Sequence, residues 1–123
     1  MPIIIQGVDL PIPVIAEIDP KNQSQLVSVY LVTFRVTGHL NPFESSSARV
    51  SFLPNPFPQN AGRQPSAAWL GDFSGGDFAE LNWTIQSVDV TGFNLFAVNI
   101  SSIIRSPGSS DGTPLTIKAF VSF

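Results

Sequence analysis

The stretch that decides the fold runs from Leu26 to Thr37 and reads LVSVYLVTFRVT. One face of this stretch carries Leu26, Tyr30, Val32, Phe34 and Val36, with Ser28 among them. Apolar residues at every second position, many of them β-branched or aromatic, predict a strand and not a helix. The opposite face begins with Val27, Val29 and Leu31 and only then turns polar. We therefore expect the first half of this strand to be covered on both sides.

Similar alternation continues through the second half of the chain, over residues 81–86, 93–98 and 115–123. Turn signals separate these runs, among them Thr91-Gly92 and the Pro-rich segment at 54–58. Many short strands joined by Gly/Pro turns are typical of an antiparallel β-sandwich. The sequence thus predicts an all-β protein with one β-sandwich domain over residues 21–123. Its expected core is Tyr30, Val32, Phe34, Val50, Phe52, Trp83, Ile85, Phe93, Leu95, Ile117, Ala119 and Val121.

Residues 1–20 are predicted to form an extended, Pro-rich apolar arm in front of the domain. Its four prolines lack an amide hydrogen, so the arm is an edge strand at most. We expect the arm to dock on another chain, while residues 25–123 fold without it. The residues expected at that interface are Ile3, Ile4, Ile5, Val8, Leu10, Ile12, Val14 and Ile15.

The composition is unusual in its low charge. Only 12 % of the residues are charged and 43 % are hydrophobic, whereas about 25 % charged residues is ordinary. A surface this poor in charge indicates either that part of it is covered or that the chain is a low-charge secreted domain. We favour the covered surface and expect a homo-oligomer, with a trimer favoured, or packing with other structural proteins. The six Lys and Arg are scattered singly, which argues against nucleic acid and against a basic membrane-surface helix.

The start of the chain lacks the pattern of a secretory signal. It has no basic segment, and its first apolar run stops after three isoleucines. No stretch approaches the roughly 18 apolar residues of a membrane span. We therefore expect synthesis in a cytoplasm without export by the usual route. The chain also has no cysteine, so disulfides and Cys-based chemistry are excluded.

Few residues carry the chemistry of a catalytic or metal site. His39 is the only histidine, and neither a Ser-His-Asp arrangement nor a zinc site is built from one His without Cys. Asp72 and Asp77 flank two glycines, which suits calcium or an ordinary turn, and Asp72 with Asp77 or Glu80 is a conceivable glycosidase pair. We expect no catalytic residues, cofactor or metal.

One loop is a candidate for binding a ligand, through Trp69, Asp72 and Asp77. Trp69, with Phe73 and Phe78 nearby in the sequence, offers aromatic faces on which a sugar ring packs. The alternative interpretation is that these aromatic residues belong to the core or to an interface.

A series of features in residues 49–123 supports a family comparison. In order they are Val50-Ser51-Phe52, Pro56-Phe57-Pro58, Ala68-Trp69-Leu70-Gly71-Asp72 and the run from Ser87 to Thr91-Gly92-Phe93. This order resembles an H-type lectin domain, which implies a six-stranded sandwich that trimerises and binds sugar between subunits. The segment 99–104 departs from the family, since it has neither the Trp nor the His that would line the sugar site.

Together these features favour a non-catalytic structural subunit of a larger assembly. Virus and phage particles use small β-sandwiches of this kind as capsid decoration (cement) proteins and as tail or fibre components, and such proteins are made in the host cytoplasm. We therefore expect a virion protein. The alternative is an H-type-lectin-like carbohydrate-binding module.

Overall fold

The computed structural model describes residues 3–18, 25–52, 57, 63–74, 81–108 and 113–123. Within these residues every regular element is a strand, so the all-β prediction is confirmed. The strands are β1 (Ile4–Val8), β2 (Ile12–Ile18), β3 (Gln25–Thr37), β4 (Ser45–Ser51), β5 (Ala67–Ser74), β6 (Leu81–Asp89), β7 (Gly92–Asn99) and β8 (Leu115–Ser122).

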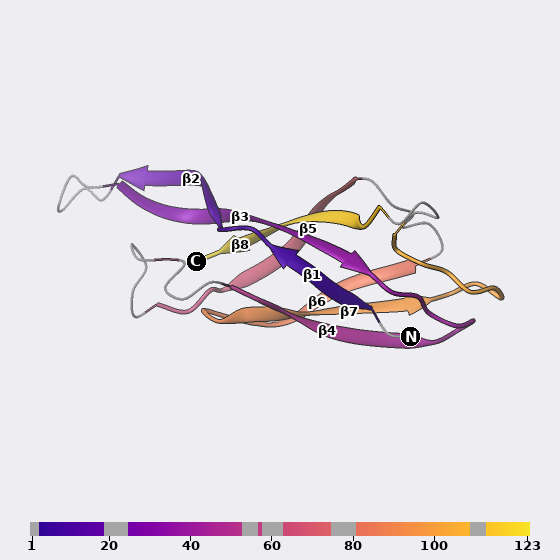
Figure 1. Ribbon diagram of the computed structural model, residues 1–123. Coiled ribbons are helices and arrows are strands. Elements are labelled where there is room, and N and C mark those ends of the chain that lie inside the picture. Colours follow the sequence, from indigo (N-terminus) through magenta and orange to yellow (C-terminus); the bar gives the residue numbers. More distant parts are fainter. Residues whose placement is uncertain (1–2, 19–24, 53–56, 58–62, 75–80, 109–112) are drawn as a thin grey trace.

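The strands form two antiparallel sheets that pack face to face (Figure 1). A five-stranded sheet has the order β1-β3-β8-β5, with β2 also paired to β3, and a three-stranded sheet has the order β4-β7-β6. The sheets meet at both sides, where β1 contacts β4 and β5 contacts β6. This arrangement is the β-sandwich that the alternating pattern predicts.

The long strand β3 organises the five-stranded sheet because three partners share its two edges. On one edge β8 pairs along its length, from Val29 opposite Ser122 to Val36 opposite Leu115. On the other edge β1 pairs with one end of β3, and β2 pairs with the other end. The Pro-rich arm is therefore an edge element of its own chain's sheet. Both strands have register shifts, in β1 between Ile5 and Gly7 and in β2 from Pro13 to Ala16, and the one beside Pro13 is expected where a proline interrupts a ladder.

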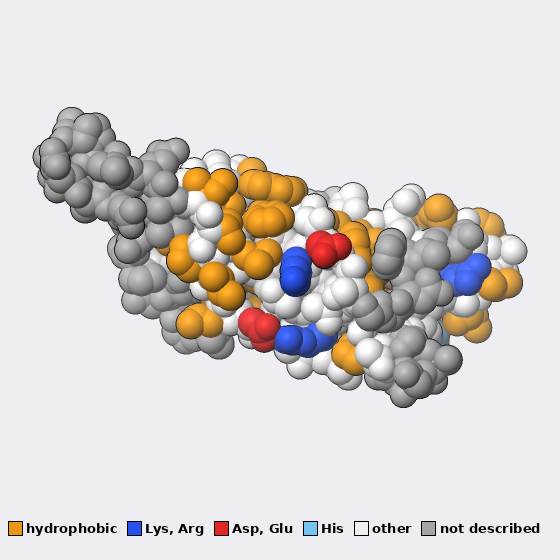
Figure 2. Space-filling model, turned by 90° about the horizontal axis from the view of Figure 1, so that it is seen from above, with side chains coloured by type: hydrophobic (Ala, Val, Ile, Leu, Met, Phe, Trp, Pro, Cys, Tyr) orange, Lys and Arg blue, Asp and Glu red, His pale blue; other side chains and the backbone are white. Residues whose placement is uncertain are grey.

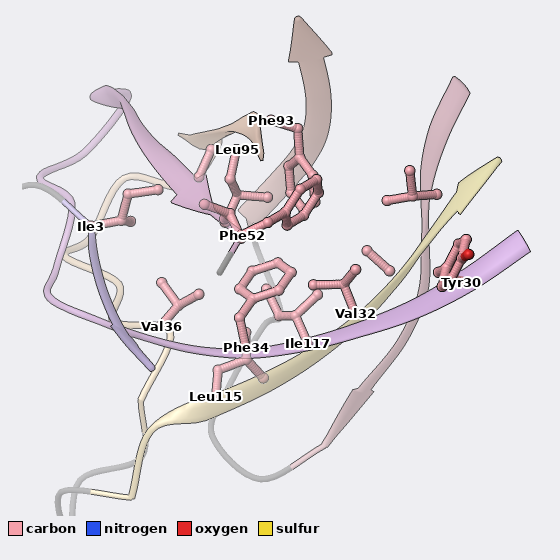
Figure 3. Close-up of a cluster of buried hydrophobic side chains, with 14 of the residues drawn as sticks. Ile3, Tyr30, Val32, Phe34, Val36, Phe52, Phe93, Leu95, Leu115 and Ile117 are labelled. Carbon is pink, nitrogen blue, oxygen red and sulfur yellow. The ribbon is translucent and has the colours of Figure 1, made fainter. Parts of the chain in front are cut away.

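The core lies between the two sheets, where the alternating residues of both inner faces meet (Figure 3). The core prediction is confirmed for ten of its twelve residues, and Trp83 and Ile85 are only partly buried against the same cluster. Phe34 of β3 meets Phe93 of β7 edge to face, with ring centroids 5.7 Å apart. Such pairs contribute stability beyond that of the apolar area that they bury. This pair therefore helps to hold the two sheets together.

The first residue described, Ile3, also belongs to this core. It is 3 % exposed, and its backbone amide donates to Ser46 Oγ at 3.3 Å, which ties the start of β1 to β4. The prediction that Ile3 contacts another chain is thus corrected: its side chain fills the space between the sheets of its own chain. Ile5 and Val8 also pack against the core.

A tight turn joins β6 to β7 at the end of the three-stranded sheet. The Asp89 carboxylate accepts hydrogen bonds from the backbone amides of Thr91 and Gly92, and from Nη2 of Arg49 at 2.9 Å. Gly92 has a φ of +153°, and a Cβ atom built on it would lie 2.1 Å from the Val50 carbonyl oxygen. Only glycine fits there, which explains the Thr-Gly turn seen in the sequence.

Candidate functional site

The outer face of the five-stranded sheet carries a row of large apolar side chains that crosses four strands. Cross-strand register places Ile12 of β2 opposite Leu31 of β3, Leu31 opposite Phe120 of β8, and Phe120 opposite Trp69 of β5. Their chain neighbours on β3 and β8, such as Val32 and Ala119, are fully buried in the core. Because successive side chains of a strand point to opposite faces, this row points away from the core.

A second row lies beside the first and extends the apolar surface. It runs from Ile15 through Val29 to Ser122 and Ala67. Val29 is only 8 % exposed and is not part of the core cluster between the sheets, so outer-face neighbours cover it. We define the outer apolar patch as Ile12, Ile15, Val29, Leu31, Trp69 and Phe120.

The patch is strongly exposed at its two sides. Ile12 and Ile15 on the β2 side are 55 % and 52 % exposed, and Trp69 on the β5 side is 44 % exposed. Figure 2, which looks down on this sheet, shows hydrophobic side chains gathered over one part of the face and charged side chains beside them. The outer face of a sandwich is ordinarily polar, so this face is a candidate interaction surface.

A β-bulge at Gly71 shapes the aromatic side of the patch. The register shifts between Leu70 and Asp72, so Trp69 opposes Phe120 while Asp72 opposes Lys118. The shift brings Asp72 onto the same face as Trp69, which strict alternation would prevent. A Cβ atom at Gly71 would lie 2.4 Å from the Phe120 ring. Glycine therefore lets the Phe120 ring lie over the β5 backbone and stack with Trp69, at a centroid distance of 5.7 Å.

Charged residues border the patch in two oppositely charged couples. Arg35 donates to both carboxylate oxygens of Asp9, at 2.7 and 3.1 Å. This hydrogen bonding by Arg35 lowers the pKa of Asp9. Lys118 faces Asp72 across the β5–β8 ladder. Arg35 is thus paired with Asp9, Lys118 lies opposite Asp72 in the ladder, and the charges of these four residues sum to zero.

The remaining predicted interface residues divide according to the face that they occupy. Ile4, Leu10 and Val14 are exposed like Ile12 and Ile15, whereas Ile5 and Val8 are partly buried against the core. The prediction that Trp69 and Asp72 lie in a loop is wrong, because both belong to strand β5, where the bulge at Gly71 brings them together on one face. Asp77, as well as Phe78 and Glu80, lies outside the described residues.

Sequence reasoning missed four residues of the patch region: Val29, Leu31, Phe120 and Gly71. Leu31 was expected to be covered, and the apolar outward position of Phe120 was visible in the alternation of residues 115–123. What the sequence did not indicate is that these positions are neighbours, because pairing register is not a local property.

A second group of exposed apolar residues lies at one end of the sandwich. It consists of Phe43, Ile100, Ile103 and Ile104. The fully buried Asn99 holds this end, since its Nδ2 donates to the backbone carbonyls of Leu40, Asn41 and Ile103. Leu40 and Arg105 also exchange backbone hydrogen bonds. These hydrogen bonds fix the loops that carry the group, in which the charged Glu44 and Arg105 adjoin Phe43 and Ile104 along the chain.

The part of the chain that the structure describes has no cluster of three or more His, Asp or Glu residues suited to a metal ion. No helix among those residues has the length and apolar character needed to cross a membrane. Comparisons with known protein families, with curated proteins and with solved structures found no match. The candidate site therefore rests on its own geometry.

Proposed function

We propose that this chain is a non-catalytic structural subunit that joins a larger assembly through the outer face of its five-stranded sheet. The observation that carries the proposal is the row Ile12–Leu31–Phe120–Trp69, which places large apolar side chains on the outside of four adjacent strands. Exposed apolar patches of several hundred Å² mark interaction sites in folded proteins. The low charged fraction of the chain, 12 %, agrees with a surface that is partly covered.

The arm contributes to this surface in the proposal. Leu10 and Val14, which are close to Ile12 and Ile15 along the chain, are exposed, and the arm is held on β3 by strand pairing and by the Asp9–Arg35 ion pair. The arm then acts as an edge that widens the docking face. This differs from a free arm that reaches into a neighbour.

The assembly that we propose is a virus or phage particle, with the chain as a decoration protein or a tail or fibre component. A cysteine-free β-sandwich with an exposed apolar patch on one outer face suits that role. Detection of the chain in purified particles by quantitative mass spectrometry, at many copies per particle, tests this part. Its absence from particles would restrict the proposal to other assemblies.

The docking face is tested by sedimentation velocity of the purified chain and two matched variants. Ile15→Asp places a carboxylate in the patch, and Ile100→Asp makes the same change at the far end, where the original side chain is similarly exposed. We expect the wild type and Ile100→Asp to form the same assembly and Ile15→Asp to lose it. A wild-type chain that stays monomeric at micromolar concentration and joins no other protein would contradict the proposal. The trimer expected from the sequence is a prediction that this measurement also addresses.

A second candidate function is an H-type-lectin-like carbohydrate-binding module. The observation that favours it is the Gly71 bulge, which sets Asp72 beside the exposed, stacked ring of Trp69. An aromatic ring next to a hydrogen-bonding carboxylate suits one face of a sugar. Glycan-array binding that Asp72→Ala abolishes and Asp9→Ala preserves would support this function. If no glycan binds at millimolar concentration, the assembly role stands alone.

A further inference from the structure

We infer that the partner on the outer apolar patch is a second copy of this chain, bound face to face about a two-fold axis. This inference rests on the proposed assembly role and deepens it. In a two-fold contact the same patch serves both copies. The inference names that patch as Ile12, Ile15, Val29, Leu31, Trp69 and Phe120, and it predicts a pair in place of the trimer suggested by the sequence.

The exposed apolar area of this face matches what a homodimer interface requires. The patch and the neighbouring Leu10 and Val14 have five side chains that are 44–59 % exposed, which together present apolar surface on the order of 500 Å². A standard stable interface buries about 800 Å² per partner, and homodimer interfaces are about 65 % apolar. The apolar area of such an interface, about 500 Å² per partner, is therefore about equal to the exposed apolar area of this face.

The charges around the patch are balanced within one copy of the chain. The Asp9–Arg35 ion pair measures 2.7 Å, and Lys118 lies opposite Asp72 in the ladder. Because these charges are compensated within one copy, two identical faces approach without net repulsion. A partner with a strongly charged surface would find no complementary charge here, which favours a second copy over an acidic or basic protein.

The charged residues lie on one side of the apolar rows. Thr33, Lys118 and Asp72 form the row on one side of Ile12–Leu31–Phe120–Trp69, and the second apolar row lies on the other side. A two-fold axis running across the strands through the apolar rows overlaps the apolar parts of both copies. It leaves both charged borders outside the contact, where they stay hydrated as the polar rim of an interface.

The test compares the self-association of the wild type with that of matched variants by sedimentation equilibrium. Ile12→Asp introduces a carboxylate in the patch, and Ile104→Asp makes the identical change at a residue of similar exposure, 55 % against 58 %, at the end of the sandwich. We expect a wild-type dimer, a dissociation constant at least about tenfold higher for Ile12→Asp because a buried charge is unpaired, and no change for Ile104→Asp. Trp69→Lys serves as a second patch variant, and thermal melting confirms that each variant is folded.

Cysteine cross-linking tests the two-fold geometry directly. The chain has no cysteine, so a single introduced thiol can be cross-linked only to another copy. Facing sheets lie about 10 Å apart, which is too far for a direct disulfide, so a short bismaleimide is used. We expect Ile12→Cys, Leu31→Cys or Phe120→Cys to give a covalent dimer with this reagent, while Ile104→Cys does not.

The outcomes separate this inference from the proposed function. A trimer or larger ring that Ile12→Asp disrupts would overturn the paired arrangement and leave the assembly role in place. A dimer that neither patch variant weakens, or a dimer with no cross-link at any of the three patch positions, would also overturn it. A wild-type monomer at all concentrations overturns the pairing, and it overturns the assembly role as well if no other protein binds the patch.

Discussion

The outer face of the three-stranded sheet carries Ser47, Phe96 and Thr84 in one register row. At the corresponding place the outer face of the five-stranded sheet carries Ile12, Leu31, Phe120 and Trp69. Each sheet thus has an outward phenylalanine on an inner strand, Phe96 on β7 and Phe120 on β8. Phe96 is flanked by the hydroxyl side chains of Ser47 and Thr84, whereas Phe120 is flanked by the apolar side chains of Leu31 and Trp69.

The two sheets differ on their outer faces. Their inner faces are alike, since both supply large apolar residues to one core. A folded monomer requires only that inner packing, together with outer faces that water can solvate. The apolar outer row on one sheet is therefore not explained by folding, and this is why we assign it to contact with another molecule.

The inner faces are equivalent, so truncation on either side is predicted to have the same large effect. Phe34→Ala on β3 and Phe93→Ala on β7 each remove one partner of the central aromatic pair. Each change is expected to lower the free energy of unfolding by about 3–5 kcal/mol, as measured by urea denaturation. A much smaller loss for one of them would show that the core is not shared equally between the sheets.

Two glycines provide the next comparison, because a methyl group meets different obstacles in the two sheets. At Gly92 it would overlap the β4 backbone at a φ that favours glycine, whereas at Gly71 it would meet the ring of Phe120. Since a ring can move and a paired strand cannot, Gly92→Ala is expected to cost about 3 kcal/mol and Gly71→Ala less than about 1 kcal/mol. Melting curves of the two variants measure the difference, and equal costs would contradict this explanation.

Phe120→Ser and Phe96→Ser test the outer faces themselves with one substitution. Both rings are partly buried, so each variant is expected to lose about 1–2 kcal/mol of stability. Only Phe120→Ser removes a patch residue, and only that variant is expected to weaken assembly in size-exclusion chromatography. Equal assembly by both variants would remove the functional distinction between the faces.

The smallest predicted effects concern the carboxylates of the two ion pairs, one on each sheet. Hydrogen bonding to Arg35 is the main cause of the lowered pKa of Asp9, whereas the hydroxyl and amide of Thr91 are the main cause for Asp89. In NMR titrations, Arg35→Gln is expected to return the pKa of Asp9 towards its ordinary value of 3.8. Arg49→Gln is expected to leave the pKa of Asp89 low.

The sign of the pH dependence follows from these depressed pKa values. Each carboxylate contributes stability above the pKa that it has in the unfolded chain, near 3.9, and the contribution is lost as the pH falls through the lower folded pKa. Both groups are largely in solvent, so the effect on stability is small. An Asp89 pKa that rises as much in Arg49→Gln as the Asp9 pKa does in Arg35→Gln would contradict the assigned causes.

Much of the fold follows from local patterns in the chain. The alternation in Leu26–Thr37 correctly separates the buried Val32, Phe34 and Val36 from the outward Thr33 and Arg35. The turn between β6 and β7 was recognisable from Thr91-Gly92, because the first residue of β7 has no room for a Cβ atom and must be glycine. The arm was predictable only as an extended edge element, since its prolines exclude a central strand but do not say which sheet it joins.

The candidate site was predictable only in fragments. Ile12, Ile15, Trp69 and Asp72 were identified as separate candidates, on the arm and in a loop. The structure places Ile12, Ile15 and Trp69 in one patch and Asp72 at its border, and it moves Ile3 into the core. The bulge at Gly71 decides that Asp72 shares a face with Trp69. An isolated glycine within a strand can mark such a bulge, but the sequence pattern favoured a loop at residues 71–77.

The sequence by itself determined the alternating strands at residues 26–37, 81–86, 93–98 and 115–123, with the inner and outer side of each, and the low charge that leaves apolar residues at the surface. These properties are local, because alternation and turn chemistry depend on residues close together in the chain. The tertiary structure alone decided that residues 12, 31, 69 and 120 lie side by side. The physical reason is strand register: it is chosen by the packing of the whole core, and a slip of one residue would turn a strand's outward side chains inward.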